Sequence, residues 1–349
     1  MNYLSPKALE IEPYTPGEQP RDRKYIKLNT NENAYPPSPR VKAAISGLTD
    51  SLRLYPDPDC GALRAAIARR HGVQPENVFV GNGSDEVLAF AFEALVGSEG
   101  VLTPDIGYSF YPVYADLFGL KFSTVRLNDD FTVPWRELIS DKTVALANPN
   151  APTSLAVGSG DLLEVAKGLA RNGRAFIVDE AYCDFGGESM AKYIGECDNL
   201  LVVRTFSKAY SLAGMRVGYA LGAPGLIDGL NRIKNSFNSY PVDTLAQAAA
   251  RAAIEDEGYF EFTRNAIIGT REKFSAELSR LGFDVPKSRA NFVFPEHKTA
   301  PARELFQKLR ESGILVRYFD KPRLSNRLRI TIGTPEDMAE VVRVLEKLV

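Results

Sequence analysis

Metal-binding side chains are scarce in this sequence of 349 residues, which has two histidines and three cysteines. Cys60, Cys183 and Cys197 are odd in number and show no Cys-x-x-Cys spacing. The sequence therefore predicts neither a zinc site nor a disulfide framework. We expect free thiols, no metal and a cytoplasmic location, because thiols persist in reducing compartments.

Long hydrophobic runs and an excess of one charge are also missing. No stretch approaches the roughly 20 apolar residues of a membrane-spanning helix, and residues 1–6 have neither the basic nor the apolar part of a secretory signal. The 42 lysines and arginines face 44 aspartates and glutamates, which gives a formal net charge of −2. Nothing here predicts binding to nucleic acid or to a membrane surface.

Short apolar runs alternate with amphipathic segments, and this pattern predicts the fold class. Thr143–Ala147 is typical of a buried parallel strand, whereas Cys60–His71 has apolar residues at helical spacing. The alternation predicts an α/β domain with a mainly parallel sheet. We expect strands at residues 78–80, 100–102, 143–147, 175–178, 200–203 and 217–221, and helices at 41–48, 60–71, from within 81–86 to 95, 108–118 and 161–171.

The C-terminal part has a different pattern, which predicts a smaller α+β domain. A helical region from about 244 to 281 is followed by expected strands at 291–294 and 328–332 and helices at 302–312 and 335–348. Since a chain of this length exceeds one simple core, we expect two domains. We assign 1–40 to an extended arm, 41–240 to the large domain and 241–349 to the small domain.

Lys208 lies in the most informative segment, Thr205–Arg216, directly after the apolar run Leu200–Val203. Two hydroxyls before the lysine and Arg216 after it suit a phosphate, and the lysine suits a carbonyl. Pyridoxal 5'-phosphate offers both groups, so the segment predicts this cofactor. Taken alone, an exposed lysine in a turn of small residues is the simpler interpretation.

Other polar residues follow strand ends. Asp179 could hold a pyridine nitrogen protonated, and the glycines of Gly81–Glu86 open a helix whose N-terminus could bind a phosphate. Asn150 lies in a proline-rich turn, and Arg329 alternates with apolar residues, where a buried guanidinium needs an anion. Each one alone is equally a cap, a turn or a surface residue. Because ligands bind beyond the carboxyl ends of strands, we expect Asp179 and Lys208 to face one crevice.

Together these motifs resemble the fold-type I pyridoxal-phosphate aminotransferases, in the family's motif order and over nearly the whole chain. The Thr205–Gly214 segment is the most specific of them. Leu28–Asn33 and Leu54–Asp57 favour the subfamily of histidine biosynthesis, whose amino donor carries a phosphate and whose acceptor is 2-oxoglutarate. The resemblance implies a large domain with a mainly parallel seven-stranded sheet, a smaller α+β domain, and a homodimer in which the arm contacts both the small domain and the partner.

The resemblance also implies roles for individual residues. Lys208 binds the cofactor covalently, Asp179 pairs with its pyridine nitrogen, and Tyr182 contacts its ring oxygen; these are the expected catalytic residues. Tyr55 reaches the cofactor phosphate of the neighbouring subunit. Tyr108 stacks on the ring, and the expected phosphate contacts are Ser84, Asp85, Thr205, Ser207 and Arg216. The expected substrate contacts are Arg329, Arg317, Tyr14 and Asn33.

The turn at residues 150–154 departs from the family pattern. The family usually has Asn-Asn-Pro-Thr-Gly, and this chain has Asn150-Ala151-Pro152-Thr153-Ser154. The family asparagine that bonds the ring oxygen aligns best with Ala151. Either Asn150 takes over this bond or Tyr182 makes it alone, and we assign Asn150 to the cofactor site.

Other functions stay open at this stage. An aromatic amino acid aminotransferase or a threonine-phosphate decarboxylase of the same fold would share these motifs, and a non-catalytic ligand sensor could keep Lys208 and Asp179. A nucleotide-binding protein is disfavoured, because Glu86 stands where a Gly-x-Gly-x-x-Gly motif needs its third glycine and no P-loop is present.

Overall fold

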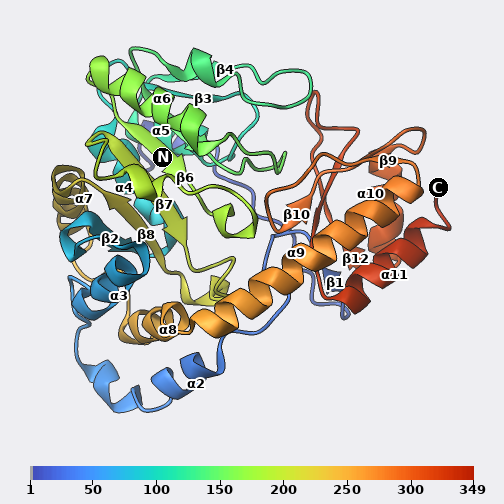
Figure 1. Ribbon diagram of the computed structural model, residues 1–349, viewed down its shortest axis with the longest axis horizontal. Helices are drawn as coiled ribbons and strands as arrows, with labels where there is room; N and C mark the ends of the chain where they lie inside the picture. Colours follow the sequence, from blue (N-terminus) through green and yellow to red (C-terminus); the bar gives the residue numbers. More distant parts are fainter. Residues whose placement is uncertain (1–2) are drawn as a thin grey trace.

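The computed structural model describes residues 3–349; residues 1 and 2 of the expected arm lie outside this range. Its main feature is a seven-stranded sheet (Figure 1). Six strands are mutually parallel, and β8 runs antiparallel to both of its neighbours. In spatial order the strands are β2 (Val78–Gly81), β8 (Gly218–Gly222), β7 (Leu200–Thr205), β6 (Phe176–Asp179), β5 (Thr143–Ala147), β3 (Val101–Pro104) and β4 (Phe122–Val125). The expected α/β class with a mainly parallel sheet is confirmed.

Helices cover both faces of this sheet, which is why the strands are continuous apolar runs. In β5, Val144 and Leu146 pack on one face, and Ala145 and Ala147 pack on the other. The first face is covered by α3 (Gly61–His71) and α6 (Ser159–Arg171), and the second by α4 (Gly83–Leu95), α5 (Tyr111–Phe118) and α7 (Pro224–Phe237). Apart from the edge strand β4, the sheet is thereby buried, and its strand ends are fixed in position.

Several elements differ from the sequence-based expectation, and three of them belong to the large sheet or to the helices after it. The edge strand β4 was not expected, because Phe122–Val125 is half exposed and has no apolar run. The helix α7 was also not expected, although Pro224 and the apolar spacing after it are start and pattern signals. The expected helix over 244–281 is two helices, α8 (Thr244–Ile254) and α9 (Glu257–Arg280), because the backbone leaves the helical conformation at Asp256.

The C-terminal elements form a second body, joined to the sheet region by the long helix α9 (Figure 1). It contains the antiparallel sheet of β10 (Phe292–Val293), β14 (Leu328–Thr331) and β13 (Arg317–Tyr318), and the pair β9 (Phe283–Asp284) and β11 (Glu296–His297). Its helices are α10 (Ala302–Glu311) and α11 (Pro335–Leu345). The domain boundaries at 40 and 240 stay predictions.

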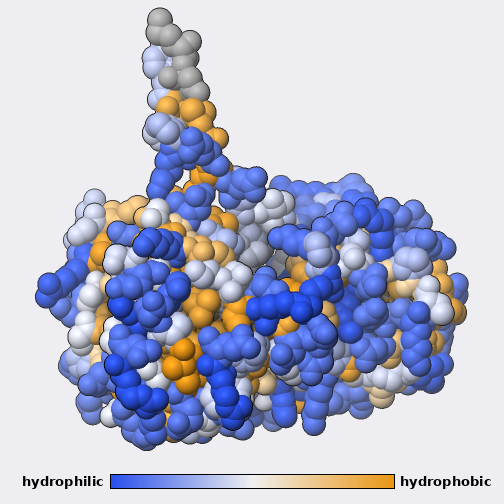
Figure 2. Space-filling view, turned by 90° about the horizontal axis from the view of Figure 1, so that it is seen from above, coloured by the Kyte–Doolittle hydropathy of each residue, from blue (hydrophilic) through white to orange (hydrophobic). Residues whose placement is uncertain are grey.

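The N-terminal segment contacts both bodies. Strand β1 (Ile26–Lys27) pairs in parallel with β12 (Ile314–Leu315), and α2 (Pro39–Ile45) packs on α8. The short helix α1 (Pro6–Glu10) belongs to a stretch that stands away from the body in Figure 2. Within residues 3–349, no helix is long and apolar enough to cross a membrane, and no group of His, Cys, Asp and Glu could hold a metal.

Candidate active site

A cavity of about 650 Å³ opens where the carboxyl ends of the parallel strands face the C-terminal body. The last residues of β3, β5, β6 and β7 line it, namely Pro104, Ala147, Asp179 and Thr205. Its volume lies in the range of small-molecule and cofactor sites. This protein therefore has a cavity at the place where open α/β sheets bind their ligands.

Lys208 and Asp179 both line this cavity. The loop after β7 carries Lys208, whose Nζ donates to the backbone oxygen of Thr30 at 3.2 Å. Asp179 is 5% exposed; its Oδ1 accepts from the Ala181 amide at 3.0 Å and its Oδ2 from the Tyr111 hydroxyl at 3.4 Å. Burial is the main cause that raises the pKa of Asp179 to about 7, so a cationic partner would favour its charged form.

Two tyrosines frame the same region. The hydroxyl oxygen of Tyr182 accepts from the Asn31 side-chain amide at 3.0 Å, and the Lys208 ammonium lies 5.7 Å from the centre of the Tyr182 ring. Tyr108 donates to Asp85 Oδ1 at 2.6 Å. The pKa of Tyr108 is well above its usual value, chiefly because the ring is buried.

The start of α4 and Arg216 form one end of the cavity. Arg216 donates to Asp85 Oδ2 at 3.1 Å and to Ser207 Oγ at 3.4 Å. Two glycines make this close approach possible. A Cβ on Gly83, whose φ is +81°, would lie 2.6 Å from Arg216 Nη2, and one on Gly218 would lie 2.3 Å from the Ser84 amide nitrogen. Free helix amides, hydroxyls and a guanidinium thus converge, which suits a phosphate.

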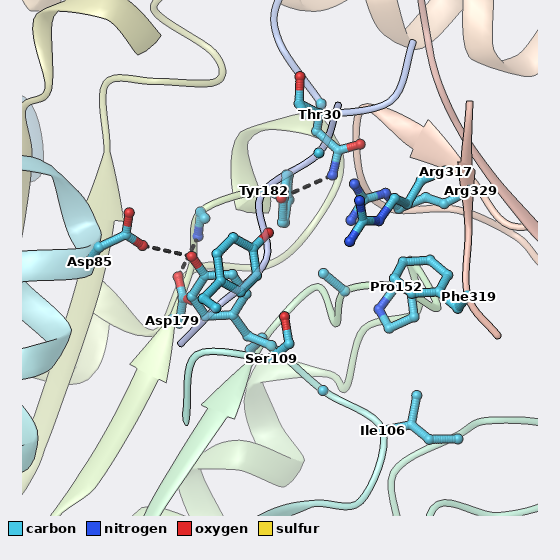
Figure 3. Close-up of a pocket in the computed structure, with 18 of the residues that line it drawn as sticks. Thr30, Asp85, Ile106, Ser109, Pro152, Asp179, Tyr182, Arg317, Phe319 and Arg329 are labelled. Atoms are coloured by element: carbon cyan, nitrogen blue, oxygen red, sulfur yellow. Dashed lines mark hydrogen bonds between the residues drawn. The ribbon is translucent and has the colours of Figure 1, made fainter. Parts of the chain in front are cut away.

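The opposite end carries two arginines that point into the cavity side by side in Figure 3. Arg317 on β13 and Arg329 on β14 are paired across the antiparallel ladder. Arg329 donates to the backbone oxygen of Asn29 at 2.8 Å, but its buried Nε has no partner. Burial lowers the pKa of Arg329. Tyr14, stacked on Phe110 at 4.3 Å, lines the same cavity.

Three expected site residues do not line the cavity. Asn150 is buried, and its amide nitrogen donates to the Ile106 backbone oxygen at 2.9 Å and to the Thr153 hydroxyl at 3.1 Å, while Ala151 faces the cavity instead. Asn33 donates to the backbone oxygen of Lys208 at 2.9 Å. Tyr55 is 82% exposed. The other expected residues are brought together: Tyr14, Ser84, Asp85, Tyr108, Asp179, Tyr182, Thr205, Ser207, Lys208, Arg216, Arg317 and Arg329.

Sequence reasoning gave no individual role to three residues that touch this group. Thr30 accepts from Lys208, Asn31 donates to Tyr182, and Tyr111 donates to Asp179. The Leu28–Asn33 motif pointed to the subfamily and so was a signal for the first two. The sequence held no signal for Tyr111, because it lies 68 residues from Asp179 in a helix whose apolar residues indicate only packing in the core.

These residues fit pyridoxal phosphate. Its phosphate suits the Arg216 end, its carbonyl the amine of Lys208, and its cationic ring nitrogen the buried carboxyl of Asp179, which lacks a charged partner among its hydrogen bonds. The unpaired Nε of Arg329 lies in the other end, where a substrate anion would satisfy it.

Comparisons with known proteins agree with this geometry. The chain is 51% identical over 346 residues to the histidinol-phosphate aminotransferase of Clostridium beijerinckii, covering 98% of this chain and 96% of that protein. It is 49% identical over 353 residues to that of Acinetobacter baumannii, covering 99% and 97%. A solved structure of histidinol-phosphate aminotransferase from Sinorhizobium meliloti, in complex with pyridoxal-5'-phosphate, matches with a TM-score of 0.90 at 25% identity, covering 100% and 99%.

The fold and the cavity define a fold-type I pyridoxal-phosphate-dependent transferase, as the sequence predicted. The family model "Aminotransferase class I and II" matches residues 23–345, and the chain belongs to this family. It is therefore an aminotransferase, which takes an amino donor and a 2-oxo acid as substrates.

Proposed function

We propose that the chain is a histidinol-phosphate aminotransferase that transfers the amino group of L-histidinol phosphate to 2-oxoglutarate in histidine biosynthesis. The observation that carries this proposal is the Arg317–Arg329 pair in the cavity of Lys208 and Asp179. Histidinol phosphate presents a phosphate and 2-oxoglutarate presents carboxylates, and guanidinium groups bind either anion in bidentate fashion. The two relatives at 51% and 49% identity carry the same name.

The residue roles follow from the chemistry. Bound pyridoxal phosphate supplies an electron sink for the bond between the substrate Cα and its proton. Lys208 would hold the cofactor covalently, and its amine, when free, would be the base that takes the substrate Cα proton and the acid that later gives it back to the cofactor-bound carbon skeleton. Asp179 keeps the ring nitrogen protonated, and Tyr182 donates to the ring oxygen without help from Asn150. Arg329 and Arg317 orient the substrate anion, and Tyr14 closes that end.

The proposal includes a homodimer and a cytoplasmic location. Tyr55 stacks on Tyr240 with ring centres 4.7 Å apart, outside the cavity of its own chain, so its expected role needs a second subunit. The two segments that this stacked pair brings together carry further exposed apolar side chains, which a partner would cover: Leu52 and Leu54 beside Tyr55, and Phe237 near Tyr240. The location is supported by three buried free cysteines.

The test is to load the protein with pyridoxal phosphate, add L-histidinol phosphate alone, and follow the absorbance of the bound cofactor. We expect rapid conversion to the amino form, reversed by 2-oxoglutarate. Conversion by phenylalanine or tyrosine but not by L-histidinol phosphate would replace the proposal with an aromatic amino acid aminotransferase. Release of carbon dioxide from threonine phosphate would identify a decarboxylase, and no conversion by any amine would favour a sensor.

A further inference from the structure

The segment Asn29–Asn31 contacts three functional residues with three consecutive positions. The backbone oxygen of Asn29 accepts from Arg329, that of Thr30 accepts from Lys208, and the side chain of Asn31 donates to Tyr182. Asn31 is 1% exposed and has a φ of +58°, a left-handed conformation that asparagine tolerates better than most residues. The hydrogen bonds of the Asn31 side chain can be assigned proton by proton.

The trace starts at a backbone amide, which can only donate. The Asn31 N–H donates to the Thr331 hydroxyl oxygen at 3.0 Å, and the single proton of that hydroxyl goes to Asn31 Oδ1, also at 3.0 Å. Oδ1 therefore faces Thr331 and Nδ2 faces Tyr182. The opposite amide orientation would leave the proton of Thr331, a residue 2% exposed, without an acceptor, at a cost in free energy.

The next step concerns Tyr182. Asn31 Nδ2 is a donor only, so at 3.0 Å the Tyr182 oxygen must accept from it. The proton of Tyr182 is then not used by Asn31, and it is available to a group in the cavity that Tyr182 lines. A second anchor holds the arrangement, because Asn291 Nδ2 donates to the Asn31 backbone oxygen at 3.0 Å.

We propose that Asn31 is a positioning residue that fixes the direction of the Tyr182 proton, with Thr331 fixing Asn31 in turn. The inference rests on the proposed cofactor, whose ring oxygen would receive that proton. The direction of the Tyr182 proton matters more in this chain than in one with two side-chain donors to the ring oxygen. Here Ala151 faces the cavity, and the amide nitrogen of Asn150 bonds elsewhere. Tyr182 is then the side-chain donor to the ring oxygen, and its direction is set by Asn31.

The decisive variant is Asn31→Asp in the cofactor-loaded protein. Aspartate has the same shape but accepts only, so it would draw the Tyr182 proton away from the cavity. A hydrogen bond to the ring oxygen stabilises its deprotonated form, so losing this bond raises the pH midpoint at which the absorbance of the bound cofactor changes. We expect an upward shift of about one pH unit and about tenfold weaker binding of pyridoxal phosphate to the cofactor-free protein.

A double-mutant cycle with Tyr182→Phe separates direction from charge. If Asn31 acts through the Tyr182 proton, Asn31→Asp shifts the midpoint little further in the Tyr182→Phe background. An equal shift in both backgrounds would overturn the proposal, since it would be a plain charge effect. The control Asn265→Asp, an exposed position on α9, adds the same charge elsewhere and should leave the midpoint unchanged.

A second pair of variants decides the matter even if Asn31→Asp does not fold. Thr331→Val removes the hydroxyl that orients Asn31 and should raise the midpoint, whereas Thr331→Ser keeps the hydroxyl and should leave it unchanged. Equal midpoints for these two variants would overturn the proposal. Unmodified protein that takes up no pyridoxal phosphate would instead overturn the proposed function, so the two failures are distinguishable.

Discussion

Arg317 and Arg329 are direct partners in the antiparallel ladder of β13 and β14, with both guanidinium groups turned into the cavity. Two like charges opposite each other in a sheet are unfavourable unless an anion lies between them. The guanidinium carbon of Arg329 lies 5.5 Å from the ring centre of Phe292 and 5.6 Å from that of Phe319. These contacts hold the side chain, but the rings accept no hydrogen bond from its unpaired Nε. The pair is therefore arranged for a ligand and not for stability.

This arrangement predicts the effect of neutralising each arginine. Arg329→Gln and Arg317→Gln should raise the KM for L-histidinol phosphate and for 2-oxoglutarate about 10- to 100-fold, because a hydrogen bond to a charged group contributes roughly 1.5–3 kcal/mol. Steady-state kinetics with each substrate varied measures this. Arg303→Gln, at an exposed arginine paired with Asp320, is the matched control and should behave as the unmodified enzyme. Unchanged KM values in both site variants would remove the pair from substrate binding.

The raised pKa of Asp179 predicts how stability depends on pH. Its pKa is about 7 in the folded protein and 3.8 as an ordinary aspartate, so between these values the folded state binds a proton that the unfolded state has lost. Through this group, the cofactor-free protein loses stability as the pH rises from about 4 to about 7, by up to about 1.4 kcal/mol for each pH unit. His71, whose pKa burial lowers to about 3, acts in the opposite direction at acidic pH.

Asp179→Asn isolates the contribution of Asp179 from that of His71. Denaturant unfolding of the cofactor-free protein at pH 5 and pH 8 should show that the variant gains stability relative to the unmodified protein as the pH rises. Asp161→Asn, at an exposed carboxyl in the first turn of α6, should show no such gain. If the free energy of unfolding changed with pH in the same way in all three proteins, the raised pKa of Asp179 would be contradicted.

The sequence located the buried strands of the large sheet to within two residues, because such strands need continuous apolar residues on both faces. That pattern located Thr143–Ala147 with the bounds found in the structure and brought Asp179 and Lys208 to one cavity. Asn31 could not be assigned in the same way. Its partners Tyr182 and Thr331 lie 151 and 300 residues away, and only the fold determines which of its side-chain atoms faces which partner.

Asn150 shows the opposite limit of sequence reasoning. Its place after β5 suggested a cofactor contact, but the turn uses its amide nitrogen to hold Ile106 and Thr153. Sequence spacing finds the turn and does not find the direction of a side chain within it.

Ser154 stands where the family has glycine, and its φ is +66° with a buried Oγ that has no hydrogen-bond partner. A left-handed residue with a side chain is strained by roughly 1–2 kcal/mol. Ser154→Gly should therefore stabilise the protein by about 1 kcal/mol after the entropy of glycine is subtracted. Ser154→Ala removes the hydroxyl but keeps the strain, so the glycine variant should be the more stable of the two in denaturant unfolding. The reverse order would show that the strain is absent.

The expected role of Tyr55 predicts that a dimer of two different inactive variants, one altered at Lys208 and one at Tyr55, is active. Lys208→Ala should abolish turnover, because the amine that binds the cofactor and moves the Cα proton is gone. Tyr55→Ala should lose most activity if Tyr55 completes the neighbouring subunit's cofactor site. Each variant alone therefore has two defective sites per dimer.

In a mixed dimer the defects fall into one site if Tyr55 crosses the interface. That site combines the missing lysine of its own chain with the missing tyrosine of the partner, and the other site has both residues intact. Subunits of the two variants, unfolded together and refolded with pyridoxal phosphate, should regain up to about a quarter of the unmodified activity, since half of the dimers are mixed and each has one working site of two. If Tyr55 served its own chain, each mixed dimer would hold one site without lysine and one without tyrosine. Activity no higher than the average of the two separate variants would then assign Tyr55 to its own subunit.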